Sequence, residues 1–285
     1  GQTGASSTTN VDGGNNADTT SGGAGGSQVK IAIESISEFQ VISNQFDAEF
    51  GRASGAVINA VTKRGTNAFS GAGFSYSTNT AMTQANFLTE QAGAEKPQNS
   101  KFEFGGVLGG PIVQDRAHFF ASLERRLANP GKTRIFNTRP DLTRTSTERW
   151  EAWNYLIRVD NQINGSNSWA IRHLRELSPE MDTVSGRRTM NALRDAHDDE
   201  WMVVGSYTSV IGNNVVNTAR VTRGIEDYYN GPQAWLNAGG ADARSGMMAS
   251  LYPSYDHTSF MDNIAPWAGG RQDFQWQWNN TTSFF

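Results

Sequence analysis

FEFGGVLGGPIVQDRAHFFASLERR, residues 102–126, contains two alternating runs of side chains joined by a short turn. In the first run, 102–110, apolar side chains share one face and Glu103 lies on the other. The second run, 118–126, alternates in the same way, and only Phe120 interrupts it. A period of two residues is that of a β-strand. The stretch therefore predicts an antiparallel hairpin with one apolar and one polar face.

The same alternation of apolar and polar residues extends over most of the chain. After Thr66 no helical period is found, and alternating runs of about ten residues follow one another, which is the length that crosses a bilayer as a tilted strand. We predict eight such strands, at 69–77, 102–110, 118–126, 150–160, 169–176, 201–209, 215–228 and 273–279. The fourth run is clear, because Trp153 and Ile157 alternate with Asn154 and Arg158.

The connections between these runs alternate between short and long. The short ones, 111–116, 162–167 and 210–214, carry turn residues such as Asn164-Gly165. The long ones are 78–100, 127–147, 177–199 and 229–271. Outer-membrane barrels have tight periplasmic turns and long outer loops, whereas a soluble sheet has no reason for this alternation. Periodicity alone leaves a soluble half-buried sheet open, and the alternation of connections favours the barrel.

Composition agrees with a wetted β-structure. Hydrophobic residues make up 37% of the 285 residues and charged residues 18%, both below the usual values for globular proteins. Aromatic residues are plentiful, and we expect a girdle of Trp side chains at or near strand ends. The six Trp residues in question are Trp150, Trp153, Trp169, Trp201, Trp276 and Trp278.

Several classes of function are disfavoured. The chain has no Cys, which excludes disulfides and thiolate sites. A net charge of −4 with scattered Lys and Arg does not suggest a nucleic-acid partner. No apolar run is long enough for a transmembrane helix. The sequence contains no catalytic or phosphate-binding motif, so we expect neither an enzyme nor a cofactor.

The first 65 residues differ from the rest. Residues 1–28 are rich in Gly, Ser, Thr and Asn, which predicts loop or disorder. A short helix is expected at 34–39, a strand at 39–43, and a further strand in AVINAVT, 56–62. This segment is too short for a core of its own and needs a larger body to pack on.

Two stretches carry a resemblance to a known family. ESISEFQVISNQFDAEFGRASGAVINAVTKRGTN, residues 34–67, resembles the C-terminal end of the plug of TonB-dependent receptors, most closely the Oar-like branch. The hairpin 102–126 resembles the second and third barrel strands of that branch, and VDGGNNADTT, 11–20, resembles an upstream plug loop. The likeness is close over residues 10–126 and beyond that persists only as strand-and-loop texture.

The resemblance implies an all-β fold with a small α/β plug remnant, in which about eight strands form part of a large plugged barrel of about 22 strands. It implies that 1–65 is the C-terminal part of a plug and that 66–285 is the N-terminal part of the barrel. The expected setting is the outer membrane of a Gram-negative bacterium. Because the chain begins in a loop and ends inside an alternating run, we expect an internal fragment.

The implied function is uptake of a substrate with energy from the TonB complex, which would contact an N-terminal region outside this chain. The substrate, whether small molecule, glycan or peptide, is not identified by the sequence, and outer-membrane lipid is the other expected partner. The alternatives are a structural or adhesion protein that keeps the plugged barrel without transport, and a soluble β-rich binding module.

Candidate site residues follow from the same division. In the plug phrase, Glu49 and Arg52 around Gly51, with Gly55 beyond, suggest a polar lock on the barrel wall; a local ion pair in a turn is the simpler interpretation. Partners on the wall would be charged residues on polar strand faces, namely Glu124, Arg158, Asp160 and Arg220. Substrate contacts are expected in aromatic outer-loop residues, namely Trp235, Tyr252, Tyr255 and Trp267.

Two polar clusters could suggest a metal. The first, in VDGGNNAD, consists of Asp12, Asn15, Asn16 and Asp18, and its spacing does not match an EF-hand. The second is His197-Asp198-Asp199 with Asp195, at the edge of a predicted long loop. We interpret the first as a Gly/Asn turn and the second as a solvated loop, and predict no metal site.

Overall fold

The computed structural model describes residues 8–17, 29–43, 56–91, 93–134, 144–183, 194–232 and 269–285. These residues form one large antiparallel sheet, a small four-stranded sheet and a two-stranded hairpin. Among them, no helix is both long and apolar enough to cross a membrane.

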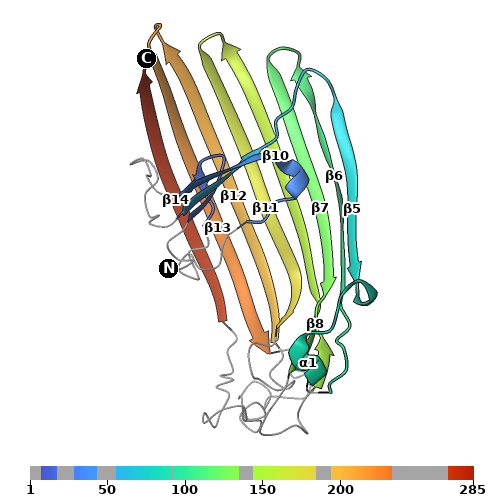
Figure 1. Cartoon of the computed structure of the whole chain (residues 1–285). Helices are drawn as coiled ribbons and strands as arrows, with labels where there is room; N and C mark the ends of the chain where they lie inside the picture. The colour runs from blue at the N-terminus through green and yellow to red at the C-terminus, as the bar shows by residue number, and fades with distance from the viewer. Residues whose placement is uncertain are drawn as a thin grey trace.

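The large sheet is a meander of eight strands in the order β14-β13-β12-β11-β10-β7-β6-β5 (Figure 1). Its strands are β5 (Ser70–Asn79), β6 (Ser100–Val113), β7 (Ala117–Asn129), β10 (Trp150–Asn164), β11 (Asn167–Thr183), β12 (Arg194–Ile211), β13 (Val215–Pro232) and β14 (Gly269–Phe284). The sheet curves and does not close, so it is a partial barrel. All eight predicted strands are confirmed, and each is longer than its alternating run.

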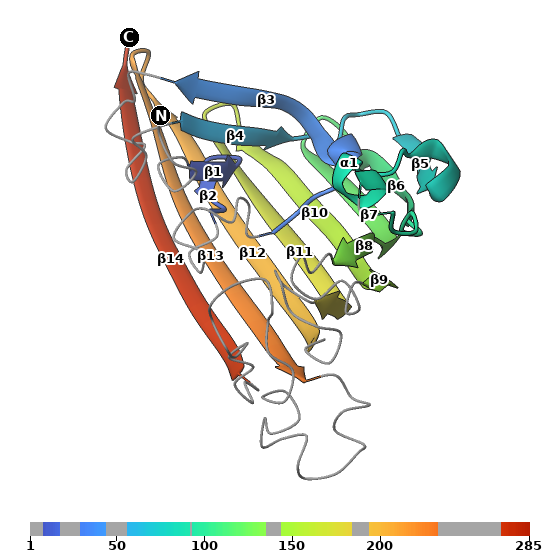
Figure 2. The same cartoon turned by 60° about the horizontal axis from the view of Figure 1, so that its bottom comes forward.

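The small sheet lies on the concave face of the large one (Figure 2). Its order is β2-β1-β4-β3, with a parallel β1–β4 pair at its centre. The strands are β1 (Thr8–Val11), β2 (Gly14–Asn15), β3 (Ile36–Ser43) and β4 (Ala56–Thr62). We call this unit the plug sheet, after the plug that the sequence resemblance predicts here, and the concave face of the large sheet the inner face.

Two predictions about the first 65 residues are wrong. The helix expected at 34–39 is only a 3-10 turn at Ile33–Ser35, because the residues after it pair with β4 as strand β3. The loop expected over 1–28 contains β1 and β2, because β4 supplies a pairing edge that overrides the polar composition of the segment. The strand predicted at 56–62 is confirmed.

Strict alternation separates the two faces of the large sheet. On β10, Ala152, Asn154 and Leu156 point inward and are at most 1% exposed. Trp153 and Ile157 point outward and are 37% and 50% exposed. The outward side chains are apolar although the inner face is already covered by the plug sheet. This pattern fits a wall with lipid on its outer side.

The tight turns and long connections alternate as predicted, but the long loops are shorter than expected. The loop expected at 177–199 is wrong in its bounds, because β11 continues to Thr183 and β12 begins at Arg194. The loop 78–100 contains the 3-10 turn η3 (Thr80–Met82) and helix α1 (Phe87–Gln91), and 127–147 contains β8 (Gly131–Arg134) and β9 (Arg144–Thr147). The last, 229–271, loses its ends to β13 and β14.

The Trp girdle is confirmed only in part. Trp150 begins β10, and Trp169 lies two residues inside the first residue of β11. Trp201, Trp276 and Trp278 lie well inside their strands, because β12 and β14 continue beyond the alternating runs from which strand ends were predicted.

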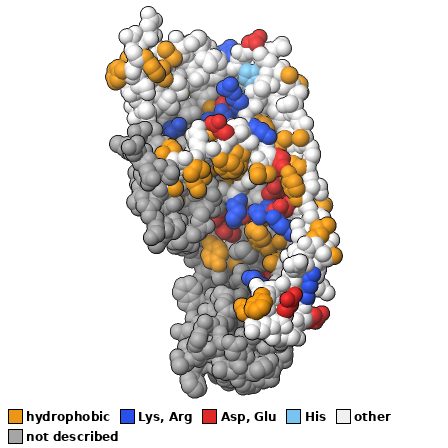
Figure 3. Space-filling view, viewed as in Figure 1, with side chains coloured by type: hydrophobic (Ala, Val, Ile, Leu, Met, Phe, Trp, Pro, Cys, Tyr) orange, Lys and Arg blue, Asp and Glu red, His pale blue; other side chains and the backbone are white. Residues whose placement is uncertain are grey.

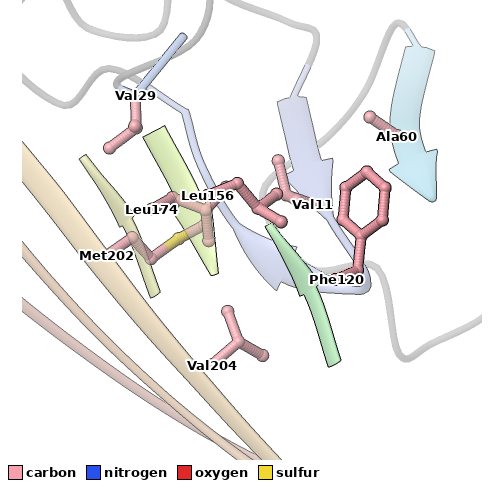
Figure 4. Packing of buried hydrophobic residues seen from close by; sticks show 8 residues of the cluster. All are labelled: Val11, Val29, Ala60, Phe120, Leu156, Leu174, Met202 and Val204. Carbon is pink, nitrogen blue, oxygen red and sulfur yellow. The ribbon is translucent and has the colours of Figure 1, made fainter. Parts of the chain in front are cut away.

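A small apolar cluster holds the plug sheet to the wall (Figure 4). Val11 and Ala60 come from the plug sheet, and Val29 from the segment between its strands β2 and β3. The wall contributes Phe120, Leu156, Leu174, Met202 and Val204. Phe120, which interrupts the alternation of its run, thus points inward as a core residue.

Candidate functional site

The turn between β1 and β2 meets a charged region of the wall. Asp12 and Gly13 both have left-handed backbone conformations, with φ of 49° and 76°. The Asp12 amide donates to the carbonyl of Ala60 at 2.9 Å, and the Gly13 amide donates to the Asn59 side-chain oxygen at 2.9 Å. These bonds fix the turn on β4 and aim the Asp12 side chain at the wall.

The Asp12 carboxylate connects both sheets. Its Oδ1 accepts from the Thr62 amide at 3.0 Å, and its Oδ2 accepts from the Thr62 hydroxyl at 2.6 Å. From the wall, Arg172 Nε lies 2.7 Å from Oδ2, and Arg158 Nη1 lies 3.7 Å from Oδ1. We call these four residues the latch.

Arg158 adds further bonds to the latch. Its Nη1 donates to the Thr62 carbonyl at 2.9 Å and to the Thr62 hydroxyl at 3.0 Å. Its Nε and Nη2 bind Asp160 at 2.8 and 2.7 Å, which fixes the guanidinium from its own strand. The latch therefore orients two arginines of neighbouring strands around one plug carboxylate.

The latch is largely shielded from water. Side-chain exposure is 4% for Asp12 and 9% for both Arg158 and Arg172. Ions at such depth are costly unless paired, and removing one partner leaves the other uncompensated. Docking of the plug sheet therefore depends on a polar contact that stabilises the assembly only while every member is in place.

A second ionic contact lies further along the wall. Lys30 donates through Nζ and through its backbone amide to Glu176, at 3.0 and 3.1 Å. Glu176 lies directly opposite Glu200 of β12, which in turn lies opposite Glu226 of β13. Lys30 thus brings a cation to a row of inward carboxylates. Figure 3 shows basic and acidic side chains close together on the face that carries the plug sheet.

The connection from plug sheet to barrel is clamped at the tight turn between β6 and β7. A Cβ on Gly65 would lie 2.1 Å from the carbonyl oxygen of Phe119, so only glycine allows this approach. Asn67 accepts from the Asp115 amide at 2.8 Å, and its oxygen lies 2.8 Å from His118 Nε2. The last plug strand therefore leads into a fixed anchor.

A polar cavity of about 690 Å³ separates the plug turn from the wall of β13 and β14. Asn and Gln side chains line much of it. The backbone N–H of Asn15 donates to the Gln277 side-chain oxygen across the cavity at 2.8 Å. Arg220 reaches the carbonyl of Gly13 at 3.5 Å. This side of the plug sheet is thus held by a few polar contacts around open space.

The predicted site residues have different outcomes. Glu49, Gly51, Arg52 and Gly55 lie outside the described residues, as do Trp235, Tyr252, Tyr255 and Trp267. Among the proposed wall partners, Arg158, Asp160 and Arg220 lie at the plug turn. Glu124 instead accepts from Asn154 at 2.9 Å and is not in the latch.

Asp12 was missed as a docking residue, because its segment was interpreted as a Gly/Asn turn. The turn itself is present. A usable signal was the set of inward arginines on neighbouring strands, Arg158 and Arg172, which require a buried acid from elsewhere in the chain. The Asn16 side chain forms two hydrogen bonds with the backbone of Val29. Its Nδ2 donates to the Val29 carbonyl and its Oδ1 accepts from the Val29 amide, both at 2.9 Å.

The cluster at 197–199 lies within β12 and not at the edge of a loop, which corrects the sequence interpretation. Asp199 points outward and pairs with Arg175, whereas Asp198 points inward, with a buried carboxylate oxygen. Within the described ranges, no group of three or more His, Cys, Asp or Glu side chains is arranged to hold a metal ion.

The chain matches a family model, one sequence relative and solved structures. Residues 61–147 match the family model of an outer membrane beta barrel domain. The TonB-dependent transporter Oar of Myxococcus xanthus is 33% identical over 111 residues, which are 38% of this chain and 10% of that protein. The chain therefore matches only a tenth of the length of this relative.

Two solved structures match the chain, and the first of them is similar in fold. The outer membrane transporter YddB of Escherichia coli matches with a TM-score of 0.62 and 13% identity, over 80% of this chain and 32% of that one. The ferric-catecholate import receptor Fiu of E. coli K12 gives a TM-score of 0.47 and 12% identity, over 100% of this chain and 51% of that one.

The resemblance to TonB-dependent outer-membrane transporters and the partial-barrel fold are thus confirmed. The chain is a protein of the Gram-negative outer membrane, and the relatives named here are transporters or receptors, not enzymes.

Proposed function

We propose that this chain forms the exit end of a plug and the first eight strands of a barrel that imports a substrate with energy from TonB. In this proposal, residues 1–65 belong to the plug and residues 66–285 to the barrel. The substrate is a small molecule, glycan or peptide that remains to be identified. Contacts with it are proposed for the outer-loop residues Trp235, Tyr252, Tyr255 and Trp267.

The observation that carries the proposal is the way in which the plug sheet is held. A permanently fixed domain would bury a broad apolar interface, whereas this one combines a small apolar cluster with the latch, Lys30–Glu176 and a polar cavity. Polar, wet interfaces between domains allow relative motion. Such an interface suits a plug that must be released and re-docked.

The two ends of the plug sheet differ in how they are held, which suggests the end from which a pull would release it. Its last strand is anchored by Gly65 and Asn67, while β1 is joined to β4 by four parallel residue pairs. A pull on the chain before Thr8 acts on β1 and the Asp12 turn, and the anchor resists it. The latch then breaks, and the cavity beside β13 and β14 widens into a passage.

A disulfide lock tests the proposal, and the absence of native Cys makes it unambiguous. A Cβ on Gly14 would lie 2.9 Å from the Thr222 hydroxyl oxygen on β13, which is suitable for a cysteine pair. The same Cβ would lie 2.9 Å from Val204 Cγ2, so the Val204 side chain must shift slightly to admit it. The G14C/T222C variant of the full-length protein would be expressed in a strain that lacks the native gene. Depletion of solutes from a defined mixture of iron chelates, cobalamin, glycans and peptides would be followed by mass spectrometry.

We expect one class of solute to be depleted by the wild type but not by the deletion strain or a tonB deletion strain. The oxidised lock should abolish that depletion, and a reductant should restore it. G14C and T222C alone serve as controls: T222C should transport normally, and G14C measures the effect of the Val204 shift without a crosslink. Equal uptake by oxidised and reduced locks would refute plug movement, and an unchanged solute profile in the deletion strain would refute import.

A further inference from the structure

The outer face of the barrel carries a repeated arginine. Arg125 on β7 lies nine residues beyond the tight turn that ends at Arg116. Arg175 on β11 lies nine residues beyond Ser166, and Arg223 on β13 nine residues beyond Asn214. All three point outward, because side chains alternate along a strand and a neighbour of each arginine points inward. These buried neighbours are Glu124, Glu176 and Thr222.

The spacing places these arginines at one membrane boundary. Nine residues of strand span about 30 Å, and a tilt of about 40° reduces this to about 23 Å of height. The apolar band of an outer-membrane barrel is about 25 Å tall. Because tight turns face the periplasm, the arginines mark the outer-leaflet edge of the band. Most outward residues between turn and arginine are apolar, such as Ile171 and Val221, and the polar exceptions include His173 and Asn217.

Two of the three arginines are paired with carboxylates. Arg125 binds Glu151, and Arg175 binds Asp199 through Nε at 2.7 Å and Nη2 at 2.5 Å. Arg223 differs from them because, within the described part of the chain, it forms no ion pair and no hydrogen bond. Its Nε is buried without an acceptor; Nη1 of Arg125 is as well, but Arg125 is paired with Glu151. A guanidinium has five donors, so Arg223 lacks its acceptor partner.

The surroundings of Arg223 are aromatic. Its guanidinium carbon lies 4.9 Å from the centre of a Trp276 ring and 5.6 Å from that of Trp201. The ring centre of Trp201 lies 6.2 Å from that of His173, and the ring centre of His173 lies 5.6 Å from that of Tyr155. Aromatic rings hold the cation by its faces and leave its edge for an anion.

We propose that Arg223, held between Trp201 and Trp276, binds the phosphate of an outer-leaflet glycolipid. A guanidinium recognises phosphate with two parallel hydrogen bonds, which supply the missing acceptors. The acyl chains of the same lipid would lie along the apolar outer side chains below the ring of arginines. The source is a phosphorylated glucosamine lipid, because such lipids form the outer leaflet at this height.

Native mass spectrometry of the full-length, delipidated protein in detergent tests the proposal. The protein would be titrated with diphosphoryl lipid A, with lipid A stripped of its phosphates, and with phosphatidylglycerol. R223Q should weaken binding of diphosphoryl lipid A at least about tenfold, the loss expected for one charge-assisted bidentate contact. R223K should retain part of the affinity. Removal of the phosphates should weaken wild-type binding to a similar extent.

R125Q is the matched control. Arg125 also faces outward and lies 4.7 Å from the ring centre of Trp153, but it is paired with Glu151, which Arg149 Nε also binds at 3.0 Å. We expect its affinity to stay within about twofold of wild type. Heat-modifiable gel migration would verify that each variant is folded.

Unchanged lipid A binding by folded R223Q would overturn the proposal. Equal, Arg223-dependent binding of phosphatidylglycerol would overturn the assignment to the glycolipid. Loss of binding by R125Q as large as by R223Q would show general electrostatic attraction, which also contradicts a specific site.

Discussion

Replacing Asp12 by Asn should release the plug sheet from the barrel wall. Asn tolerates the left-handed backbone of this turn, so D12N removes the charge without adding strain. The Asn oxygen can still accept from the Thr62 amide. What is lost is the attraction to Arg172 and Arg158, together with one acceptor for the Thr62 hydroxyl.

The size of the effect follows from the burial of the latch. Removing one partner of a buried ion pair costs about 3–5 kcal/mol. Two features lower this figure: Arg158 keeps Asp160, and the Asn amide keeps one of its bonds to Thr62. We therefore expect about 2–3 kcal/mol, which corresponds to a population of the undocked state raised roughly 30- to 160-fold.

Hydrogen exchange followed by mass spectrometry measures this population directly. In the full-length protein, amides of residues 8–17 and 56–62 should exchange roughly 30- to 160-fold faster in D12N than in wild type, if local opening limits exchange. E38Q is the control. Glu38 lies on the same plug sheet and faces the cavity, but it is exposed and hydrogen-bonds only Gln40 within the described residues. Exchange in D12N as slow as in E38Q would refute the view that the latch holds the plug.

Three further predictions concern the anchor and the membrane face. G65A should cost about 1–3 kcal/mol on urea unfolding because its Cβ meets the Phe119 carbonyl; G165A, with open space around the Cβ, should be neutral, and equal midpoints would contradict the clamp. I157R should lower refolding stability in lipid vesicles by about 2–4 kcal/mol, a loss that a water-facing position would not show. N67A should speed trypsin cleavage in the linker before the anchor several-fold, and unchanged cleavage would remove Asn67 from that role.

The sequence was sufficient to locate all eight wall strands and the orientation of their side chains. Alternation was informative because one face meets lipid and the other meets the plug sheet, as Trp153 and Asn154 illustrate. Strand length could not be predicted in the same way. Near the outer ends, at His197–Asp199, both faces are polar, so the strand continues without the alternation that identifies it.

The latch lay beyond sequence reasoning for a different reason. Asp12 and Arg172 are 160 positions apart, and only the parallel pairing of β1 with β4 brings the turn to the wall. A short polar strand inside a Gly-rich segment gives no local signal, because its partner strand supplies the stabilisation. The wall residues of this site were easier to predict, because inward charges such as Arg158 and Asp160 are conspicuous on alternating strands.

Site-directed spin labelling along β10 tests most directly whether this sheet is a barrel wall with lipid on one side and a plug on the other. Single cysteines at 152–159 would be introduced into the full-length protein in lipid vesicles, since the chain has no native Cys. Labels at the outward positions 153, 155, 157 and 159 should be accessible to oxygen dissolved in the membrane, and labels at the positions between them should not. Loss of this two-residue alternation, or water accessibility of the outward positions, would contradict the account.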